Sequence, residues 1–498
     1  MPVLTRRELL AAAALAAVGV ATGCARPATD SRAAETALAD LAKRLRGSVV
    51  RAGAPNYEKL ATPRNLRFAA TMPQAVVLCA DAADVATAVQ WAQKTGTAFA
   101  IRGGGHNYLD ASSSRGIIIC TRTMNTATID GTTMRAQAGV RNADLAALLP
   151  QGGRGRLLLP GGNCAAVGVV GLTLGGGIGP NAAWAGLTAD RLQAVTMVTA
   201  AGGGVTASAT ENPDLFWALG GGTGGNFGVV TDLEYELVEV PVTRATTGLL
   251  TFRGRDAVVA SALAFQQVRA GNSRTVTGTW VSVPARGDVA AELRVQVLAG
   301  EDGTRDLLAP LLAIPGVQTE IIERPWWDAY AWYVTVPSPP YAFWDRSLYA
   351  DRDLSGDAIT AALEVLRRFP VGADDQEGAL SLFGWVGGAV NDAAADATAY
   401  VHRSARVLIE IATGWATPPD SAGPIAPVPA DIAEWVEQLW EVLLPHTTAR
   451  SYQNFPDPQL SDWASAYYGD NLARLQGVKA TWDPGDVFAH RQGIPLPR

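Results

Sequence analysis

The sequence contains few charged residues and few of the side chains that bind metals. Asp, Glu, Lys and Arg make up 17% of its 498 residues, and there are only four His and four Cys. The 40 basic residues are outnumbered by 47 acidic ones and form no cluster, which argues against nucleic-acid binding because phosphate contacts need grouped Lys and Arg. No CxxC or HExxH pattern occurs, so the sequence predicts no metal site. A disordered chain is excluded because 48% of the residues are hydrophobic.

The hydrophobic run near the N-terminus is too short to cross a membrane as an ordinary helix. It extends from Leu9 to Val20 and follows Arg6-Arg7, a pair typical of a twin-arginine (Tat) export signal. Ala21-Thr22-Gly23-Cys24 resembles a lipobox, in which the cysteine carries lipid. We therefore expect residues 1–30 to be a leader, and the mature protein to be extracellular or a cell-surface lipoprotein attached through Cys24. Alternatively, residues 1–30 are an ordinary cleaved signal peptide and Cys24 is incidental.

Hydrophobic patterning divides the remaining chain into three regions, in keeping with two or three domains at this length. Residues 35–245 alternate short buried strands with helices, whereas residues 246–445 show the apolar alternation of an antiparallel sheet in an α+β domain. Residues 446–498 are aromatic and polar. The clearest expected strands are 75–79, 99–102, 116–120, 193–200, 229–237, 277–283, 293–297 and 408–411, and the clearest expected helices are 257–267, 357–369, 429–443 and 461–475.

Three glycine-rich loops occur within about 130 residues of one another. The first, 102–108, places three glycines between a strand and His106; the second, 161–179, surrounds Cys164; and the third, 214–231, precedes a β-branched strand. Glycines allow close backbone approach to a ligand, and successive N–H groups in such turns bind anions such as pyrophosphate. Three loops of this kind predict one extended ligand that is flat or phosphorylated.

Other interpretations of the loops remain open from the residues alone. His106 could be a structural histidine, Cys164 an inert buried thiol, and the glycines solvent-exposed turns. A Rossmann fingerprint is disfavoured, because residues 156–160 make a poor central strand and the glycines do not open an amphipathic helix.

Taken together, these motifs resemble the berberine bridge enzyme-like family of FAD-linked oxidases, within the vanillyl-alcohol oxidase fold group. The segments that match are RGGGHNY at 102–108, the loop 162–179, DLFWALGGGTGGNFGVVT at 214–231 and the closing signature from Tyr452 to Phe488. The resemblance implies a two-domain PCMH-type fold of class α+β. In it, residues 35–245 bind FAD in two α/β subdomains, residues 246–445 bind substrate on an antiparallel sheet, and residues 446–498 return to the FAD domain.

The resemblance also implies how FAD is held. His106 would bond the flavin 8α carbon and Cys164 the flavin C6, which makes the cofactor bicovalent. The cofactor contacts expected on this basis are Arg102, Gly103, Gly104, Gly105, His106, Asn107, Cys164, Val167, Gly168, Gly171, Leu174, Gly175, Gly176, Gly177, Gly179, Gly228, Val230, Tyr452 and Asn454.

Oxidation of an alcohol or amine carbon by a flavin requires a group that takes up the substrate's proton. Tyr452 is the first candidate base, because the resemblance places it at the flavin, although a phenol needs help to lose its proton near neutral pH. Glu410, in the middle of an expected strand, is the second candidate; alternatively it lies on a solvated strand face. Alternatively, Tyr452 only packs on the substrate and does not act as the base.

Val167 lies where the family controls access of O2 to the flavin, and valine there resembles the oxidases. We therefore expect a small molecule such as a sugar, secondary metabolite or amine to be oxidised, with O2 reduced to hydrogen peroxide. The alternatives are a dehydrogenase with another acceptor and a non-catalytic surface lipoprotein that retains the flavin fold.

Overall fold

The structure is a computed structural model that describes residues 31–152, 155–285, 287–335, 339–370, 377–415 and 426–497. The chain forms two compact units, residues 1–44 and residues 45–498. In the first unit the described element is α2 (Ser31–Lys43). The expected leader, with Arg6-Arg7 and Cys24, lies outside the described residues, so its export and lipidation stay predictions.

The second unit begins with a small sheet built as the sequence predicts. Its strand order is β1 (Ser48–Arg51), β2 (Ala75–Leu78), β4 (Ile117–Cys120) and β3 (Phe99–Arg102), with β2, β4 and β3 parallel and β1 antiparallel to β2. Helix α4 (Ala82–Thr95) connects β2 to β3, and the Asp81 carboxylate caps it by accepting a hydrogen bond from the Asp84 backbone N–H. The expected strands 75–79, 99–102 and 116–120 are confirmed, as is the alternation of strands with helices predicted for this region, whereas β1 was not predicted.

A second sheet follows, and all of its pairings are antiparallel. Its order is β5 (Ala127–Asp130), β6 (Thr133–Gln137), β10 (Val229–Glu236), β8 (Leu192–Val198) and β9 (Gly204–Ser208). A two-stranded ladder pairs β7 (Leu157–Leu158) with β11 (Val238–Glu239). The helices of this part of the chain are α3 (Tyr57–Ala61), α5 (Asn142–Leu148), α6 (Val169–Leu174), α7 (Ala182–Ala185) and α8 (Pro213–Leu219).

The third sheet has seven strands and comes almost entirely from the region predicted to be antiparallel. Its order is β15 (Gln318–Pro325), β12 (Arg244–Arg253), β14 (Asp288–Val297), β13 (Val276–Ala285), β17 (Glu377–Phe383), β18 (Val407–Gly414) and β16 (Arg346–Ala350). Every pairing is antiparallel, which confirms the α+β class expected for this region.

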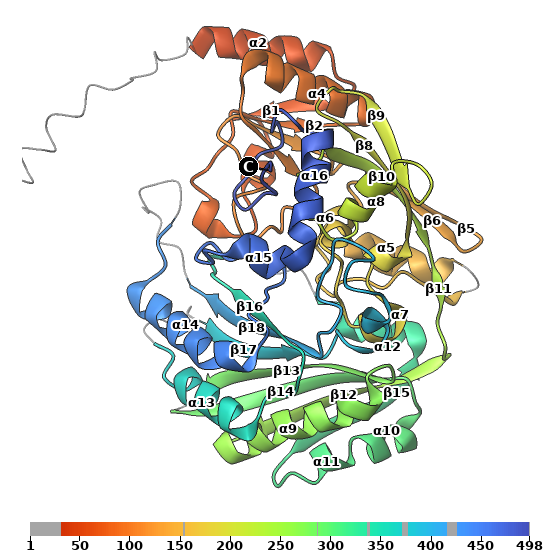
Figure 1. The fold of residues 1–498 in the computed structure, drawn as a ribbon, viewed down its shortest axis with the longest axis vertical. Helices are drawn as coiled ribbons and strands as arrows, with labels where there is room; N and C mark the ends of the chain where they lie inside the picture. The colour runs from red at the N-terminus through yellow and green to blue at the C-terminus, as the bar shows by residue number, and fades with distance from the viewer. Residues whose placement is uncertain are drawn as a thin grey trace, which may run out of the picture. The chain divides into compact units, whose positions relative to one another are not determined.

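The two faces of the seven-stranded sheet have different roles. One face is apolar and packs in a core with α9 (Arg255–Asn272), α13 (Gly356–Leu366) and α14 (Ala430–Leu443), which cover it as Figure 1 shows. The remaining helices of this region are α10 (Glu301–Leu307), α11 (Ala309–Leu312) and α12 (Trp326–Tyr333). Because strand side chains alternate, the opposite face presents Phe383, Leu408 and Glu410.

The C-terminal segment returns to the first half of the unit (Figure 1), where α16 (Leu472–Trp482) contacts α8. The single helix predicted over 461–475 is wrong, because the segment forms α15 (Trp463–Tyr468) and α16 with a break between them. Gly469 lies at that break with φ +49°, a conformation that favours glycine and ends the helix.

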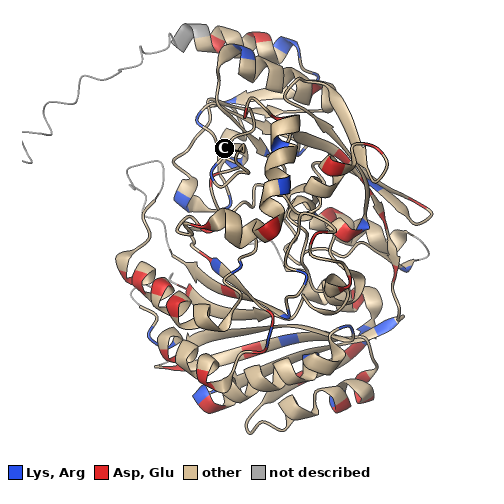
Figure 2. Ribbon diagram, viewed as in Figure 1, with Lys and Arg blue, Asp and Glu red and all other residues tan. Residues whose placement is uncertain are grey.

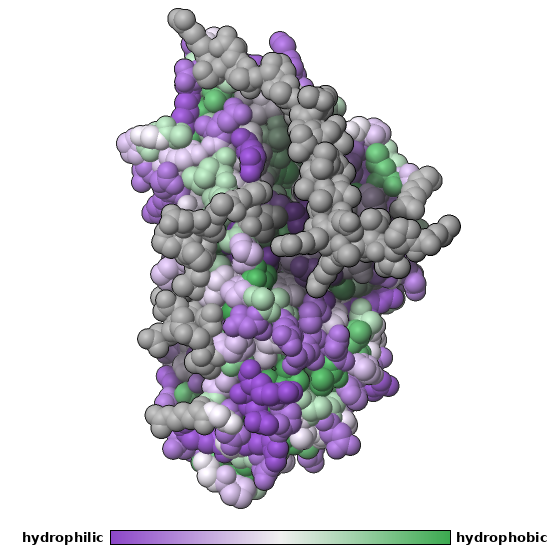
Figure 3. Space-filling model, turned by 90° about the vertical axis from the view of Figure 1, so that its left-hand side faces the viewer, coloured by the Kyte–Doolittle hydropathy of each residue, from purple (hydrophilic) through white to green (hydrophobic). Residues whose placement is uncertain are grey.

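The surface offers little contiguous apolar area. The large hydrophobic side chains that are exposed in the described chain are only Leu263, Val283, Ile322 and Tyr341, and the face in Figure 3 mixes hydrophilic and hydrophobic residues. Figure 2 shows Lys and Arg dispersed among acidic residues rather than gathered in a stripe. No helix within the described ranges is both long and apolar enough to cross a membrane.

Candidate active site

A cavity of about 440 Å³ lies where the three glycine-rich loops meet the seven-stranded sheet and the C-terminal segment. Most of the residues predicted to form the site line it. These are Gly103, Gly104, Gly105, His106, Asn107, Cys164, Val167, Gly168, Gly171, Leu174, Gly228, Val230, Glu410, Tyr452 and Asn454. Segments as distant in sequence as the loop after β3 and the C-terminal segment therefore meet at one place.

Arg102 does not line the cavity, so the expectation that it contacts the cofactor directly needs correction. Its side chain is 2% exposed, and its guanidinium donates hydrogen bonds to the carbonyls of Ser112 (2.9 Å), Leu60 (2.6 Å) and Ala61 (2.9 Å). Burial lowers its pKa to about 10, so it stays charged at neutral pH. Arg102 thus fixes the base of the loop that carries His106.

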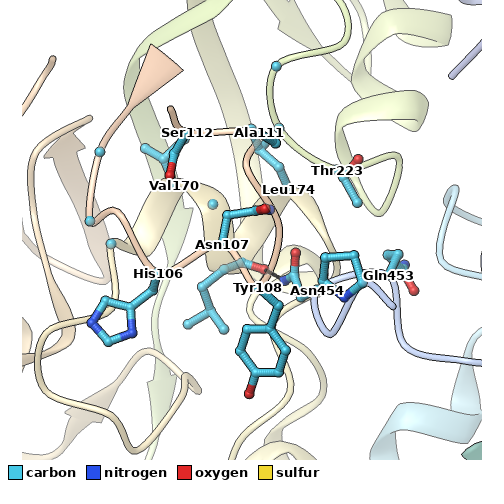
Figure 4. A pocket seen from close by; sticks show the side chains of 18 of the residues that line it. His106, Asn107, Tyr108, Ala111, Ser112, Val170, Leu174, Thr223, Gln453 and Asn454 are labelled. Carbon is cyan, nitrogen blue, oxygen red and sulfur yellow. Dashed lines mark hydrogen bonds between the residues drawn. The ribbon is translucent and has the colours of Figure 1, made fainter. Parts of the chain in front are cut away.

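The imidazole of His106 is held in its neutral form. Burial lowers its pKa to about 4, and the nearby positive charges of Arg64, Arg122 and Arg141 act in the same direction. A neutral imidazole has a free lone pair and can act as a nucleophile. The imidazole and the ring of Tyr108 leave the same loop in different directions, as Figure 4 shows.

The loops of His106 and Cys164 touch through glycine backbones. A Cβ at Gly104 would overlap the Gly168 nitrogen, and a Cβ at Gly168 would lie 2.6 Å from the Gly104 nitrogen, so neither position has room for a side chain. The Cys164 carbonyl accepts a hydrogen bond from Asn142 Nδ2 at 3.0 Å, and its thiol is exposed. Although Cys164 is exposed to the cavity, the protein atoms around its thiol desolvate it and raise the pKa of the thiol, and a hydrogen bond with Thr335 opposes that rise. The Gly104–Gly168 contact therefore holds the loop of His106 against the loop of Cys164.

The later glycines of the second loop do not line the cavity, contrary to the prediction. A Cβ at Gly175 would overlap the Asn454 amide, one at Gly176 would overlap the Tyr400 ring, and one at Gly179 would overlap the Gly161 carbonyl. Gly177 has φ +82° and would overlap Thr188. These four glycines serve close packing inside the protein rather than contact with a ligand. The loop also contains the short helix α6.

The third glycine-rich loop is tied to the C-terminal segment by a buried ion pair. The Lys479 ammonium donates to the Asn226 carbonyl at 2.9 Å and to the Asp483 carboxylate at 2.6 Å. Asp483 also accepts the Phe488 backbone N–H at 2.9 Å. Phe488 and His490 reach the cavity from this segment, and neither was predicted as a site residue.

Tyr452 lines the cavity with its hydroxyl oxygen already occupied by two donors. Ile178 N–H donates to it at 3.3 Å and Asn454 Nδ2 at 3.1 Å. Burial raises the pKa of Tyr452, and the two hydrogen bonds only reduce that rise. Because the oxygen accepts both bonds, the phenol is better arranged to donate its own proton toward a ligand than to remove one.

Glu410 is buried, and the alternative that it lies on a solvated strand face is wrong. It is 8% exposed, lies opposite Ser381 of β17 and Ser347 of β16, and lines the cavity. Tyr108 Oη donates to Glu410 Oε1 at 3.3 Å, and burial raises the pKa of Glu410 to about 7. Burial and the charge of Glu410 also raise the pKa of Asp345 well above its usual range. A carboxyl group with a pKa near 7 is suited to general-base catalysis at neutral pH.

The aromatic residues that line the cavity with Glu410 were not predicted as site residues. Tyr108, Phe383, Trp385 and Phe455 line the cavity with it. Tyr108 directly follows the predicted contact Asn107 and ends the motif 102–108, and Phe455 directly follows the predicted contact Asn454, so these positions could have indicated both residues. The dense aromatic stretch 326–349 is largely structural, since Trp326, Tyr330 and Trp344 belong to the hydrophobic cores.

The residues around the cavity fit a flavin nucleotide. A Cβ at Gly171 would meet no protein atom within 4 Å although the position lines the cavity, so the missing side chain leaves room for a ligand. Ser112 Oγ also lines the cavity, is buried, and has no hydrogen-bond partner in the described part of the protein. A glycine cradle with an unpaired hydroxyl is what a phosphate or ribose group requires.

Comparisons with known proteins agree with this site. The FAD binding domain family matches residues 73–208, and the family described as berberine and berberine like matches residues 451–495. An FAD-linked oxidoreductase of Bacillus subtilis is 30% identical over 464 residues, which cover 91% of this chain and 97% of that protein. The chitooligosaccharide oxidase of Gibberella zeae is 28% identical, with 89% and 91% covered.

Among solved structures, glucooligosaccharide oxidase from Acremonium strictum, with 6-S-cysteinyl, 8α-N1-histidyl FAD, superposes with a TM-score of 0.79 at 25% identity. The superposition covers 93% of this chain and 98% of that one. The fold predicted from the sequence, a PCMH-type FAD-binding fold, is confirmed.

Proposed function

Because this chain belongs to the berberine bridge enzyme-like family of FAD-linked oxidoreductases, we propose that it is an exported oxidase that binds FAD through two covalent links. The observation that carries this proposal is the direct backbone contact of Gly104 with Gly168, which holds together the loops of His106 and Cys164 at one cavity that Glu410 also lines. Each side chain would bond one position of the flavin, His106 the 8α carbon and Cys164 C6.

The covalent links can be tested on denatured protein. Flavin should remain with acid-precipitated wild-type protein, and peptides that contain His106 or Cys164 should carry the added mass. His106→Ala and Cys164→Ala should each keep one link, whereas the double variant should release free FAD. Unmodified peptides at both positions in flavin-replete protein would contradict the proposal.

FAD held by His106, Cys164 and the glycine-rich loops would supply the hydride acceptor for a C–OH or C–N carbon of the substrate. Glu410 accepts the proton from the substrate's oxygen or nitrogen, since its pKa of about 7 leaves a large share of the carboxyl groups ionised at neutral pH. Tyr452 donates a hydrogen bond that orients the same atom, and the packed rings of Tyr108 and Phe455 exclude water beside it. Asn454 is anchored by its bond to the Leu172 carbonyl at 3.0 Å, which positions Tyr452 in turn.

O2 is the electron acceptor in this proposal, and the small side chain of Val167 supports it. Val167 lines the cavity three residues after Cys164, so a larger side chain there would narrow the space next to the attached ring. Dithionite-reduced protein should reoxidise in air and form hydrogen peroxide, and Val167→Leu should slow that step. Slow reoxidation of the wild type, with fast turnover on an artificial acceptor, would favour a dehydrogenase.

Residues 1–30 of the sequence support the export and the lipid attachment included in this proposal. We expect Arg6→Lys with Arg7→Lys to keep the protein inside the cell, and Cys24→Ala to release it from the membrane fraction. The measurement is cell fractionation with detection of the covalent flavin. Membrane association that survives Cys24→Ala would exclude the lipid anchor.

A further inference from the structure

The cavity continues along β3, away from the loop that carries His106, until it meets the C-terminal segment. The residues that line this part of it are Phe99, Ile101, Phe488 and His490. The rings of Phe99 and Phe488 meet edge to face with their centroids 5.8 Å apart. A strand advances about 3.3 Å per residue, so the start of β3 lies about 10 Å from its end. An extended ligand that is attached at the His106 loop would bring its far half to this place.

The part of the C-terminal segment that carries His490 is fixed by contacts on either side of it. The Ile494 backbone N–H donates to Asn226 Oδ1, in the third glycine-rich loop, at 2.8 Å. Arg491 Nε lies 3.4 Å from Asp110 Oδ1, just beyond the first glycine-rich loop. The imidazole of His490 therefore has a defined position between two of the loops that form the cavity.

The imidazole of His490 presents an acceptor atom that the protein leaves unused. Its Nδ1 lies 3.0 Å from the Arg491 carbonyl oxygen, and because a carbonyl can only accept, Nδ1 carries the hydrogen and donates it. Burial lowers the pKa of His490, so the ring is neutral and Nε2 keeps a lone pair. Nε2 is buried and has no hydrogen-bond partner in the part of the chain that the structure describes. A buried acceptor of this kind indicates a ligand that donates a hydrogen bond to it.

The Gly224 carbonyl is a second acceptor beside the same ring. No backbone N–H of the described residues donates to it. A Cβ at Gly225 would lie 3.7 Å from His490 Nε2 and 3.9 Å from Ile101 Cδ1, so polar and apolar groups meet here. Two acceptors beside apolar walls suit a flat ring with an amino group at its edge, because an amino group donates two hydrogen bonds. A hydroxyl donates only one, and an ionised phosphate donates none.

Resting on the FAD binding proposed above, we propose that His490 is a specificity-determining residue that recognises the adenine ring of FAD. Its Nε2 and the Gly224 carbonyl each accept a hydrogen bond from the exocyclic amino group. The side chains of Phe99, Ile101 and Phe488 enclose the base. His490 thus selects an adenine dinucleotide over a flavin mononucleotide, whereas the two covalent links hold the flavin at the other end.

Flavin titration of the full-length His106→Ala/Cys164→Ala variant tests this, because flavin binding is reversible once both attachment points are removed. The probes are FAD, flavin hypoxanthine dinucleotide, in which a carbonyl replaces the amino group, and FMN, and binding is followed by flavin fluorescence. FAD should bind at least about tenfold more tightly than the hypoxanthine analogue, because deamination places an oxygen opposite two acceptors.

Adding His490→Leu to this variant should weaken FAD binding about tenfold, remove the preference for FAD over the analogue and leave FMN binding unchanged. His490→Gln offers an amide oxygen as the acceptor and should retain part of the preference. His446→Leu is the matched control, because His446 is also half-buried and does not line the cavity.

Equal binding of FAD and the hypoxanthine analogue, an unchanged preference in His490→Leu, or an equal weakening of FMN binding would overturn the assignment. If the double variant does not stay folded without flavin, the same comparison uses the chain with native His106 and Cys164, produced without flavin and supplied with each nucleotide, and the flavin-to-protein ratio is measured. A preference for FAD that depends on His490, in a protein whose wild type releases its flavin in acid, would show that only the covalent links fail. Protein that binds no flavin at all would overturn both proposals.

Discussion

Replacing Glu410 by glutamine should remove one well-defined contribution to the pH dependence of the protein's stability. The carboxyl group is 8% exposed and faces the cavity beside Tyr108 and Asp345. Burial raises its pKa from 4.5 to about 7 in the folded protein, so between these two values the folded state binds the proton more tightly than the unfolded state does. This contribution to stability is complete below pH 4.5 and is lost as the pH rises through about 7.

The size of the effect follows from that difference in pKa. One pKa unit corresponds to about 1.4 kcal/mol, so Glu410 should reduce the free energy of unfolding by about 3 kcal/mol between pH 4.5 and pH 8. Glutamine does not ionise and can keep the hydrogen bond from Tyr108. The stability of Glu410→Gln relative to the wild type should therefore rise by about 3 kcal/mol over the same interval.

Urea unfolding of both flavin-loaded proteins, followed by tryptophan fluorescence at pH 4.5 and pH 8, measures this difference. Glu377→Gln on the neighbouring strand β17 is the matched control, because that side chain is exposed and should leave the pH dependence unchanged. If the stability difference between Glu410→Gln and the wild type is the same at both pH values, the carboxyl group does not lie in a desolvated site and the assignment of Glu410 as the base loses its support.

Three further predictions test the site and the contacts that support it. The kcat/KM of the wild type should rise as the pH increases through about 7, since the base must be ionised, and Glu410→Gln should be slow at every pH in a peroxide assay. Gly168→Ala should destabilise the protein by about 1–3 kcal/mol and reduce flavin content, whereas Gly171→Ala should reduce flavin content alone; thermal unfolding and absorbance spectra separate the two. Equal stability losses for Gly168→Ala and Gly171→Ala would contradict the argument that only Gly168 is closely packed. Lys479→Met should cost about 3–5 kcal/mol in urea unfolding, and the exposed Arg474→Met less than about 1 kcal/mol; a similar small loss for both would show that the buried ion pair does not hold the C-terminal segment.

The elements that were predicted correctly are those whose sequence signals act within a few residues. Strands β2, β3 and β4 and helix α4 follow from apolar runs, an aspartate cap and terminal glycines, all of which act within a few residues. The prediction of one helix over 461–475 was wrong because Gly469, a single residue with positive φ, ends the first helix within an otherwise continuous helical pattern. The short edge strand β1 depends on pairing with β2 and carries no strong pattern of its own.

The candidate site likewise has features that were predictable from local patterns and features that were not. That His106 and Cys164 belong to glycine-rich loops was predictable, because the spacing of glycines is visible along the chain. Which glycines line the cavity and which, like Gly175 and Gly179, make room for neighbouring protein atoms depends on how the chain packs in three dimensions. The tertiary structure also decided that Glu410 is buried, since strand register and the partner Tyr108, which lies 302 positions away, set the environment of the carboxyl group. Packing and desolvation depend on contacts between segments that are distant in sequence, and no local pattern contains those contacts.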